Sequence, residues 1–422
     1  MSYASTLEIS RNRSLAARLV GNLLGFQAVL SALTLVLCLS IGAQLFSGTT
    51  WAAVVVLSLD LILKSVKSTL RWLLKGFEQF GTESVSLLIE RVSILALGLA
   101  ALLLGYGVVG FVLVFAGVRI IDTLGLFLYV RRRTLPLAPA ADLKVWEELL
   151  RKGLPFAYAG AMIVLFFQLD AVMLEQMRGA LEVGWYSAPV RVLEGLTLIP
   201  RILGYALIPT MAQLFPTSPG AVTALCARGT KYLLVAGLPI ATFGAMASDP
   251  FIRFLFGPDY APSAAAAQLL IPACVFMFLS NFGETTLACV NRFRAIVVIS
   301  TAALVLNVGL NLFLIPRAGY VGAAWATLLT EGFYFLTTAI ALQRYGHSLD
   351  WPSLLAKPLL ATAAFAATLW LLRGTPLLAA AGAASAVFAA ATLALRVWDR
   401  KESDALRSLL RGAPPRPTLL LP

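Results

Sequence analysis

The sequence feature that most constrains the fold is an internal repeat at a spacing of 212 residues. The turn YGVVG at 106–110 and the turn AGYVG at 318–322 align at this spacing. Apolar stretches that begin near residues 20, 51, 85 and 107 then align with stretches that begin near residues 232, 263, 297 and 319. A duplication of apolar segments is typical of transporters built from two related lobes. Two further apolar segments precede the second copy, and their counterparts would fall before residue 1.

The apolar segments are long enough to cross a membrane as helices. Hydrophobic residues make up 59% of the 422 residues and charged residues only 13%, whereas charged residues average ~25% in a soluble domain. Apolar runs of about twenty residues match a hydrocarbon core of ~30 Å. The sequence therefore predicts an all-α polytopic membrane protein with about twelve transmembrane helices. We expect these helices at 20–46, 51–74, 84–105, 107–130, 153–174, 181–213, 232–250, 263–288, 293–315, 319–342, 355–372 and 376–396.

The predicted segment 181–213 is longer than one bilayer crossing requires, so we expect it to tilt or bend. Pro189, Pro200 and Pro209 provide places for a bend, because proline lacks the amide that continues the helix.

Residue types that are rare in the sequence argue against several classes of chemistry. His347 is the only histidine, and the four cysteines have spacings that suit neither a metal site nor a disulfide framework. No Walker-type phosphate loop and no nucleophile motif occurs, so we predict a protein that is not an enzyme and has no cofactor. Any energy for transport would come from a proton gradient, a sodium gradient or substrate flux. We attribute the net charge of +12 to cytoplasmic loops and expect no nucleic-acid partner.

The distribution of Lys and Arg predicts the orientation of the chain. With the N-terminus in the cytoplasm, only Arg178, Arg253, Arg317 and Arg373 fall on the opposite side. We therefore expect both termini in the cytoplasm. The longest internal loop, 131–152, begins with three arginines that we interpret as a topology anchor, and binding of anionic lipid headgroups is the alternative.

Two charged residues occupy equivalent positions in the two copies of the repeat. Arg119 lies nine residues after Gly110, and Glu331 lies nine residues after Gly322, about half-way along each predicted helix. A charge near the bilayer centre usually faces a cavity or a partner. Arg119 is a candidate ligand for a diphosphate group, and Glu331 is a candidate protonatable coupling group. The alternative for Arg119 is a local pair with Asp122, one helical turn away, and we expect Asp60 to pair with Lys64 in the same way.

Further candidate cavity residues come from polar faces of the second lobe. Arg191, Glu194 and Arg201 share one face of 181–213, and such a face must contact protein or water. We predict an Asp170–Arg191 ion pair that clamps the hairpin between 153–174 and 181–213, and we keep Asp170 as a candidate for ion coupling. We expect Arg201 to contact an anionic substrate. For four further residues we expect polar packing between helices, with sugar binding as the alternative: Asn281, Glu284, Asn307 and Asn311.

Three stretches of the sequence carry a resemblance to a known family. They are QLDAVML at 168–174 followed by VGWYSA at 183–188, FGPDYAP at 256–262, and 307–316 followed by GYVGAA at 319–324. Over nearly its whole length the chain resembles the Wzx-like polysaccharide biosynthesis proteins. These are oligosaccharide flippases of the multidrug/oligosaccharidyl-lipid/polysaccharide exporter superfamily.

The resemblance implies two six-helix lobes, often followed by two more helices, around a central cavity with alternating access. Here we expect an incomplete four-helix first lobe, so the start of the chain departs from this pattern. We predict an N-terminal lobe at 1–130, an inter-lobe loop at 131–152, a C-terminal lobe at 153–345, two extra helices at 346–398 and a tail at 399–422.

The resemblance also implies the cargo and the setting of the protein. The cargo would be an undecaprenyl-diphosphate-linked oligosaccharide repeat unit, moved across the bacterial inner membrane for O-antigen, capsule or exopolysaccharide synthesis. The expected partners are this substrate, membrane lipids, and polymerase and chain-length proteins of the same pathway, around a monomeric transporter.

Three other functions stay open at this point. The chain could be a superfamily exporter of another lipid or of a drug, although three mid-helix arginines favour an anionic cargo. It could be a glycan polymerase or ligase, although the loops expected outside the cytoplasm are short for such an enzyme. It could also be a truncated remnant that does not transport, because two helices are missing from the first lobe.

Overall fold

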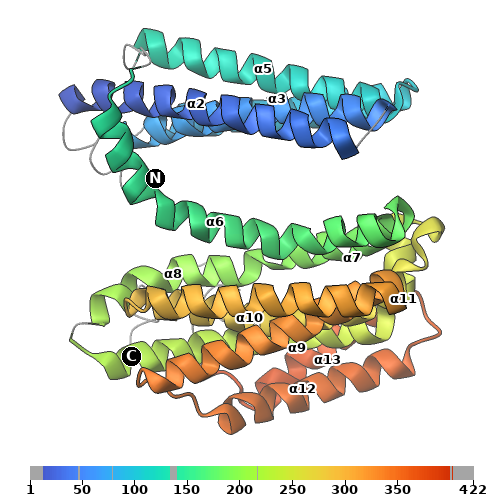
Figure 1. The fold of residues 1–422 in the computed structure, drawn as a ribbon. Coiled ribbons are helices and arrows are strands. Elements are labelled where there is room, and N and C mark those ends of the chain that lie inside the picture. The colour runs from blue at the N-terminus through green and yellow to red at the C-terminus, as the bar shows by residue number, and fades with distance from the viewer. Residues whose placement is uncertain are drawn as a thin grey trace. The chain divides into compact units, whose positions relative to one another are not determined.

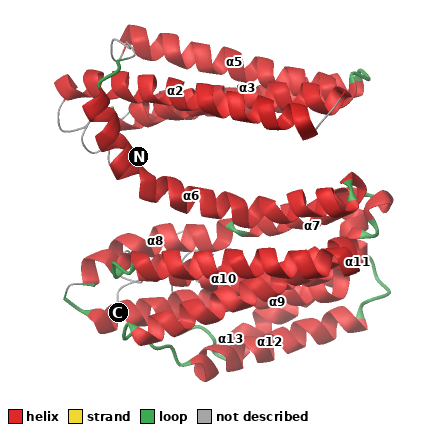
Figure 2. Ribbon diagram, viewed as in Figure 1, coloured by secondary structure: helices red, strands yellow, loops and turns green. Residues whose placement is uncertain are grey.

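The computed structural model describes residues 13–45, 48–77, 79–133, 140–215, 217–399 and 402. Within these ranges the chain is helical without strands, and short loops join the helices (Figure 2). Nine helical segments of the described chain are long and apolar enough to cross a membrane, judged by length and composition. These features confirm the predicted all-α polytopic class. The helices in Figure 1 are α2 (Arg13–Leu45), α3 (Gly48–Gly76), α4 (Phe80–Leu103), α5 (Gly107–Arg133), α6 (Leu143–Arg178), α7 (Ala180–Leu196), α8 (Leu198–Leu214), α9 (Pro219–Phe256), α10 (Ser263–Cys289), α11 (Phe293–Arg344), α12 (Trp351–Leu371) and α13 (Leu377–Ala394), with the 3₁₀ turn η1 (Pro258–Tyr260).

Each of the twelve predicted transmembrane segments corresponds to a helix or to part of one. The segment 181–213 is divided into α7 and α8, whereas α11 covers both 293–315 and 319–342 in 52 residues. The other nine predicted segments each overlap one helix.

The bend between α7 and α8 lies at Thr197, between Pro189 and Pro200. The Thr197 hydroxyl donates a 2.6 Å hydrogen bond to the Glu194 carbonyl, so the side chain satisfies a backbone group at the bend. Pro200 falls in the first turn of α8, where a missing amide costs little. The bend predicted from the prolines is therefore present.

The break inside α11 lies at Gly319, whose φ of +54° favours glycine. Two charged side chains from the turn between α6 and α7 hold this break. The Arg178 guanidinium donates to the carbonyls of residues 315 and 316 at 3.2 and 3.0 Å. The Glu182 carboxylate accepts the Tyr320 amide at 2.8 Å. Backbone groups that the break leaves without helical partners are thus satisfied by ionised side chains.

The chain forms two compact units, Met1–Tyr158 (unit 1) and Ala159–Pro422 (unit 2). The division falls inside α6, which begins at Leu143 and continues without interruption to Arg178. The expectation of a loop over the whole of 131–152 is therefore wrong at its C-terminal end, because the amphipathic stretch after residue 142 forms the first turns of α6. Residues 134–139 lie outside the described residues.

The core of unit 1 is formed where α3 contacts α2 and α5. Buried leucines of α3 (Leu70, Leu73 and Leu74) pack with Val20 of α2 and Val130 of α5. The segment before α6 is held to α2 by two hydrogen bonds, from the Ala140 amide to the Gly21 carbonyl and from the Asp142 amide to the Asn22 side chain.

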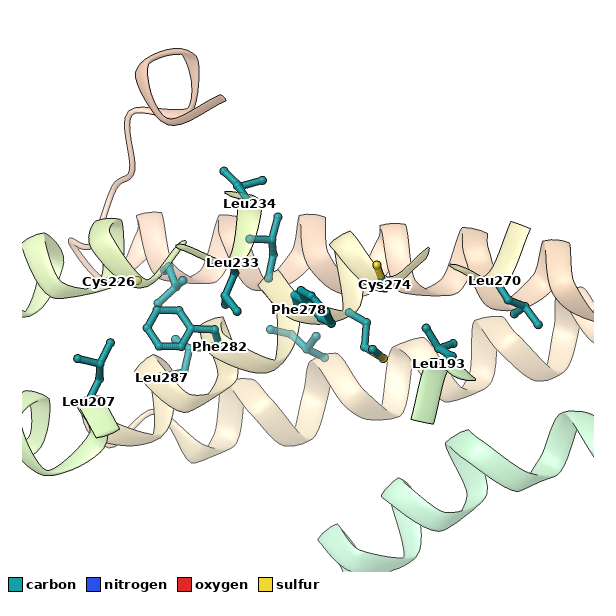
Figure 3. Close-up of a cluster of buried hydrophobic side chains, with 14 of the residues drawn as sticks. Leu193, Leu207, Cys226, Leu233, Leu234, Leu270, Cys274, Phe278, Phe282 and Leu287 are labelled. Carbon is teal, nitrogen blue, oxygen red and sulfur yellow. The ribbon is translucent and has the colours of Figure 1, made fainter. Parts of the chain in front are cut away.

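Unit 2 is organised around α10, which packs against α7, α8, α9 and α11. Phe278 and Phe282 of α10 are completely or almost completely buried, and they lie among side chains from the neighbouring helices (Figure 3). Glycines on α9 allow the close approach of the two helices. A Cβ at Gly229 would lie 2.2 Å from the Phe282 ring, and one at Gly244 would lie 2.4 Å from Ile271. Small residues at helix contacts are the usual device for tight packing in membranes.

Candidate functional site

Unit 1 contains a buried network of three basic and three acidic side chains. Glu90 of α4 is its central acid: it lies 2.5 Å from Lys67 and 2.8 Å from Arg71, both on α3, and 3.4 Å from Arg119 on α5. Arg119 makes its shortest contact, 2.6 Å, with Asp60 of α3. Asp122 of α5 completes the network at 3.3 Å from both Lys67 and Arg71.

The network explains how six ionisable groups are accommodated inside a helical membrane unit. Isolated ions in a low-dielectric interior cost several kcal/mol each, and only close pairs with good hydrogen bonds offset this. The three positive and three negative charges balance. The Ser86 hydroxyl adds a 2.6 Å hydrogen bond to Asp122. Because the partners lie on α3, α4 and α5, the network also joins these three helices.

The position of Arg119 corrects two predicted local pairs. Arg119 binds Asp60 and Glu90 from other helices, and Asp122, its predicted neighbour in sequence, binds Lys67 and Arg71. Asp60 was expected to pair with Lys64 and instead pairs with Arg119. In each case the partner comes from a neighbouring helix.

A cavity of about 270 Å³ adjoins the network within unit 1. Arg119 is part of its wall, and two further basic residues, Lys64 of α3 and Arg91 of α4, also line it. The side chains of Lys64 and Arg91 are exposed, and they form no ion pair with another described residue. The cavity therefore presents two basic groups and one further acid, Glu83, in addition to the balanced network.

In unit 2, Asp170 of α6 is buried in a cluster of uncharged polar groups. The carboxylate accepts 2.8 Å hydrogen bonds from the hydroxyls of Tyr186 and Thr327 and a 2.7 Å bond from the Asn311 amide. The side-chain amide of Asn311 also donates to the side-chain oxygen (Oδ1) of Asn307 at 3.0 Å. The structure thus brings Asp170, Asn307 and Asn311 together.

The predicted Asp170–Arg191 ion pair is not formed. Arg191 pairs with Glu194, one turn along α7, at 2.7 Å, and its side chain is 66% exposed. Asp170 instead turns toward α11, where hydroxyl and amide donors replace a positive partner. Arg201 is also exposed, as is Tyr205 beside it on α8. The polar face predicted for 181–213 is therefore present and is not covered by other parts of unit 2.

Glu331 and Glu284 form a second acidic group in unit 2. Glu331 of α11 is 3% exposed, and its Oε2 has no hydrogen-bond partner among the described residues. Glu284 of α10 accepts a hydrogen bond from the Tyr334 hydroxyl. Asn281, one turn before Glu284, donates its amide to a carbonyl of its own helix at 2.8 Å, so this contact lies within α10.

Sequence reasoning missed several residues of these clusters. Lys67 and Arg71 were interpreted as part of the cytoplasmic basic loops, yet both are largely buried. Glu90 and Tyr186 were not singled out at all. A signal for Glu90 did exist, because it lies inside an apolar run where an unpaired acid is costly.

The fold and these clusters define a multi-pass helical membrane protein. A family model described as "Polysaccharide biosynthesis protein" matches residues 2–215, half of the chain, and the chain belongs to this family. A second model, described as MatE, matches residues 155–313.

The chain is similar to several known proteins. It is 24% identical over 261 residues to the "Putative O-antigen transporter" of Shigella flexneri, with 60% of each chain covered. It is 25% identical over 210 residues to the "Probable flippase AglR" of Haloferax volcanii, with 48% of this chain and 43% of the relative covered. The chain thus spans less than two thirds of these relatives. The solved structure of lipid II flippase MurJ in an inward closed conformation matches with a TM-score of 0.75 at 11% identity, covering 97% of this chain and 88% of that one. The last comparison shows the fold alone.

Proposed function

We propose that this protein moves a lipid-linked oligosaccharide across the bacterial inner membrane by alternating access. The cargo we infer is an undecaprenyl-diphosphate-linked repeat unit for O-antigen, capsule or exopolysaccharide synthesis. The observation that carries this proposal is the basic cavity of unit 1, lined by Lys64, Arg91 and Arg119. Membership of the polysaccharide biosynthesis family supports it.

The diphosphate is the group of the cargo that these residues fit. Guanidinium and ammonium groups bind phosphate oxygens through charge-assisted hydrogen bonds, and arginine does so in a bidentate geometry. Lys64 and Arg91 have no acidic partner among the described residues, so they are available to an anion. Arg119 is held by Asp60 and Glu90, which fixes its position on the cavity wall. Arg191 and Arg201 of unit 2 stay candidates for contact with an anionic cargo, because both side chains are exposed.

The remaining parts of the proposal concern the setting and the energy source. We place both termini in the cytoplasm and infer a monomer that contacts membrane lipids and the polymerase and chain-length proteins of the pathway. The glycan would contact polar groups, and the polyprenyl tail would stay in lipid. Glu331 and Asp170 are the candidates for coupling transport to a proton or sodium gradient.

The test is a flipping assay in proteoliposomes with a fluorescent lipid-linked oligosaccharide. The double variant Lys64→Gln/Arg91→Gln should lose at least tenfold in rate, because each charge-assisted contact is worth about 1.5–3 kcal/mol. The charge-balanced variant Asp60→Ala/Arg119→Ala removes the arginine without leaving a lone acid, and we expect a similar loss. Arg201→Ala should slow transport as well.

The control variant is Arg253→Gln, an exposed basic residue paired with Asp249 in unit 2, which should transport at the wild-type rate. Wild-type rates in all the cavity variants would overturn the assignment of the cavity to the diphosphate.

A second candidate function is export of a different lipid or a drug, favoured by the match of the MatE model to residues 155–313. A cationic drug would be repelled by the cavity of unit 1 and attracted to the acidic groups of unit 2. Proteoliposomes that accumulate a cationic dye and show no flipping of the lipid-linked oligosaccharide would favour this candidate.

A further inference from the structure

The chain that follows α13 folds back onto the first turns of α9 within unit 2. The Lys357 ammonium of α12 donates a 3.0 Å hydrogen bond to the Arg396 carbonyl. Two residues later, the ring of Trp398 lies 5.8 Å from the ring of Tyr232 on α9, measured between the ring centroids. We call the described part of this segment, residues 396–399 and 402, the strap. The strap connects the end of α13 with α12 and α9.

Glu402, the last described residue of the strap, is bound by three groups. Its carboxylate accepts two hydrogen bonds from the Lys231 ammonium of α9, at 2.9 and 2.7 Å. It also accepts the Tyr232 hydroxyl at 2.6 Å and the Asp399 amide at 2.7 Å. The Glu402 and Lys231 side chains are largely buried. Burial opposes ionisation of the carboxyl, yet these hydrogen bonds hold the pKa of Glu402 below its ordinary value. Glu402 is therefore an anion held in a site that Lys231 and Tyr232 provide.

This site lies at the depth where lipid headgroups are expected. Lys231 directly precedes the apolar run 232–250 that we predict to cross the membrane. A lysine at such a boundary reaches the headgroup layer through its flexible stem and attracts anionic lipids. A phosphate oxygen accepts hydrogen bonds from an ammonium and a hydroxyl as a carboxylate oxygen does. The donors that bind Glu402 therefore also suit the phosphate of a lipid.

The repeat shows that unit 1 ties a segment to the same place by different chemistry. There the chain before α6 is bound by the Gly21 carbonyl and the Asn22 side chain. At the 212-residue spacing these two positions align with residues 233 and 234, next to Lys231 and Tyr232. The contacts in unit 1 join backbone amides to uncharged acceptors. Of these two ties, the one in unit 2 contains a cation for which a second anion can compete.

We propose that Lys231 and Tyr232 form a binding site for the phosphate of an anionic lipid, and that Glu402 fills this site in the lipid-free protein. When a lipid phosphate binds, Glu402 leaves and the strap separates from α9. When the lipid dissociates, the carboxylate returns. Anionic lipid thus changes how the end of α13 is held to α9. This inference is independent of the proposed function, and its tests need no cargo.

Lipid binding by the purified full chain tests the site directly. Native mass spectrometry measures the affinity for the most tightly bound phosphatidylglycerol. Lys231→Gln should bind it about tenfold more weakly than the wild type, because one charge-assisted hydrogen-bond donor is lost. Glu402→Gln should bind it more tightly than the wild type, because the competing anion is lost. These opposite signs separate the binding site from its competitor, although both variants release the strap.

The control for charge is Arg344→Gln, at an exposed basic residue where α11 ends. It should bind phosphatidylglycerol as the wild type does. A loss of affinity in Arg344→Gln as large as that in Lys231→Gln would show a general attraction of lipid to basic residues and overturn the site. An affinity that stays unchanged in Lys231→Gln, or that fails to rise in Glu402→Gln, would overturn it as well.

Hydrogen exchange of the strap in lipid nanodiscs tests its release. In phosphatidylcholine the Asp399 amide, which donates to Glu402, should exchange about tenfold faster in Lys231→Gln than in the wild type. Phosphatidylglycerol should accelerate exchange in the wild type and leave Lys231→Gln unchanged. Equal exchange in the two proteins, or wild-type exchange that is the same in both lipids, would overturn the release of the strap by lipid.

Inorganic phosphate distinguishes a lipid headgroup from a free anion. Added to phosphatidylcholine nanodiscs, and compared with sodium chloride at equal ionic strength, it should leave exchange of the Asp399 amide unchanged. The reason is that the membrane concentrates a headgroup at the depth of Lys231 and does not concentrate the free ion. An acceleration by phosphate that is absent with sodium chloride and lost in Lys231→Gln would assign the site to a free anion and overturn the lipid.

Discussion

The two units place ionisable groups inside membrane helices in opposite ways. Unit 1 pairs every acid of its network with at least one basic residue, across three helices and at 2.5 to 3.4 Å. Unit 2 buries Asp170 and Glu331, and the described groups around them are hydroxyls, amides or other acids. A balanced network neutralises its own charges through close ion pairs and contributes to stability. The acids of unit 2 carry charge that no ion pair with another described residue balances.

The largest expected effect comes from removing the central acid of unit 1. Glu90→Ala leaves Lys67, Arg71 and Arg119 with one acid fewer, and we expect a loss of about 3–5 kcal/mol in the free energy of unfolding. Chemical unfolding in detergent micelles measures this. Glu147→Ala, at an exposed acid on α6, is the matched control and should change stability little. Equal stability of the two variants would contradict a structural role of the network.

The next effect concerns the polar cluster of unit 2. Asp170→Asn replaces a carboxylate that accepts three hydrogen bonds, one of them from the Asn311 amide. Hydrogen bonds between membrane helices average about 0.6 kcal/mol each, so we expect a loss of about 1–3 kcal/mol, clearly less than for Glu90→Ala. The same unfolding assay tests this, with Asp259→Asn, at an exposed residue of η1, as the control. A loss as large as that of Glu90→Ala would show that the two units do not differ in this respect.

Much of the fold could be predicted from the sequence, and the reason is physical. A membrane crossing demands about twenty apolar residues, so run length locates the helices, and glycine or proline marks the breaks at Gly319 and Thr197. The start of α6 was missed because the amphipathic stretch from Leu143 resembles a surface loop helix. The hydropathy of the sequence does not show that this stretch continues directly into the membrane helix.

The clusters were harder to predict because their partners lie on different helices. The sequence identified Arg119, Asp170 and Glu331 by the cost of an ionisable group in an apolar run. It could not tell which face of each helix meets which neighbour, so local partners were preferred for Arg119 and Asp60. Lys67 and Arg71 were not recognised as buried, because the rule applied to the sequence assigns basic residues to cytoplasmic loops. In the structure both side chains form ion pairs with Glu90.

A smaller change in the free energy of unfolding, of opposite sign, should distinguish the acids of unit 2 from those of unit 1. Glu331→Gln removes an acid that has no positive partner, so it should not destabilise the protein and should raise the free energy of unfolding by up to about 1 kcal/mol. Comparison with Glu90→Gln at neutral pH isolates the difference between the units, because the chemical change is identical. If both variants lose the same stability, Glu331 has a positive partner that the described residues do not include, and the contrast between the units fails.

The smallest effect is a dependence of the free energy of unfolding on pH. It arises in unit 2, which contains His347, the only histidine of the chain. It lies buried in the loop between α11 and α12, where its Nδ1 is 2.8 Å from the Thr223 hydroxyl, and burial lowers its pKa. A histidine with a lowered pKa in the folded state contributes stability above its ordinary pKa of 6.5 and loses it as the pH falls through the lowered value. When the pH falls from 7.5 to 5, we therefore expect the free energy of unfolding to decrease more in the wild type than in His347→Gln. The difference should be on the order of a few tenths of a kcal/mol. Thermal unfolding of both proteins at several pH values measures this difference, and parallel curves would show that the His347 contact does not respond to pH.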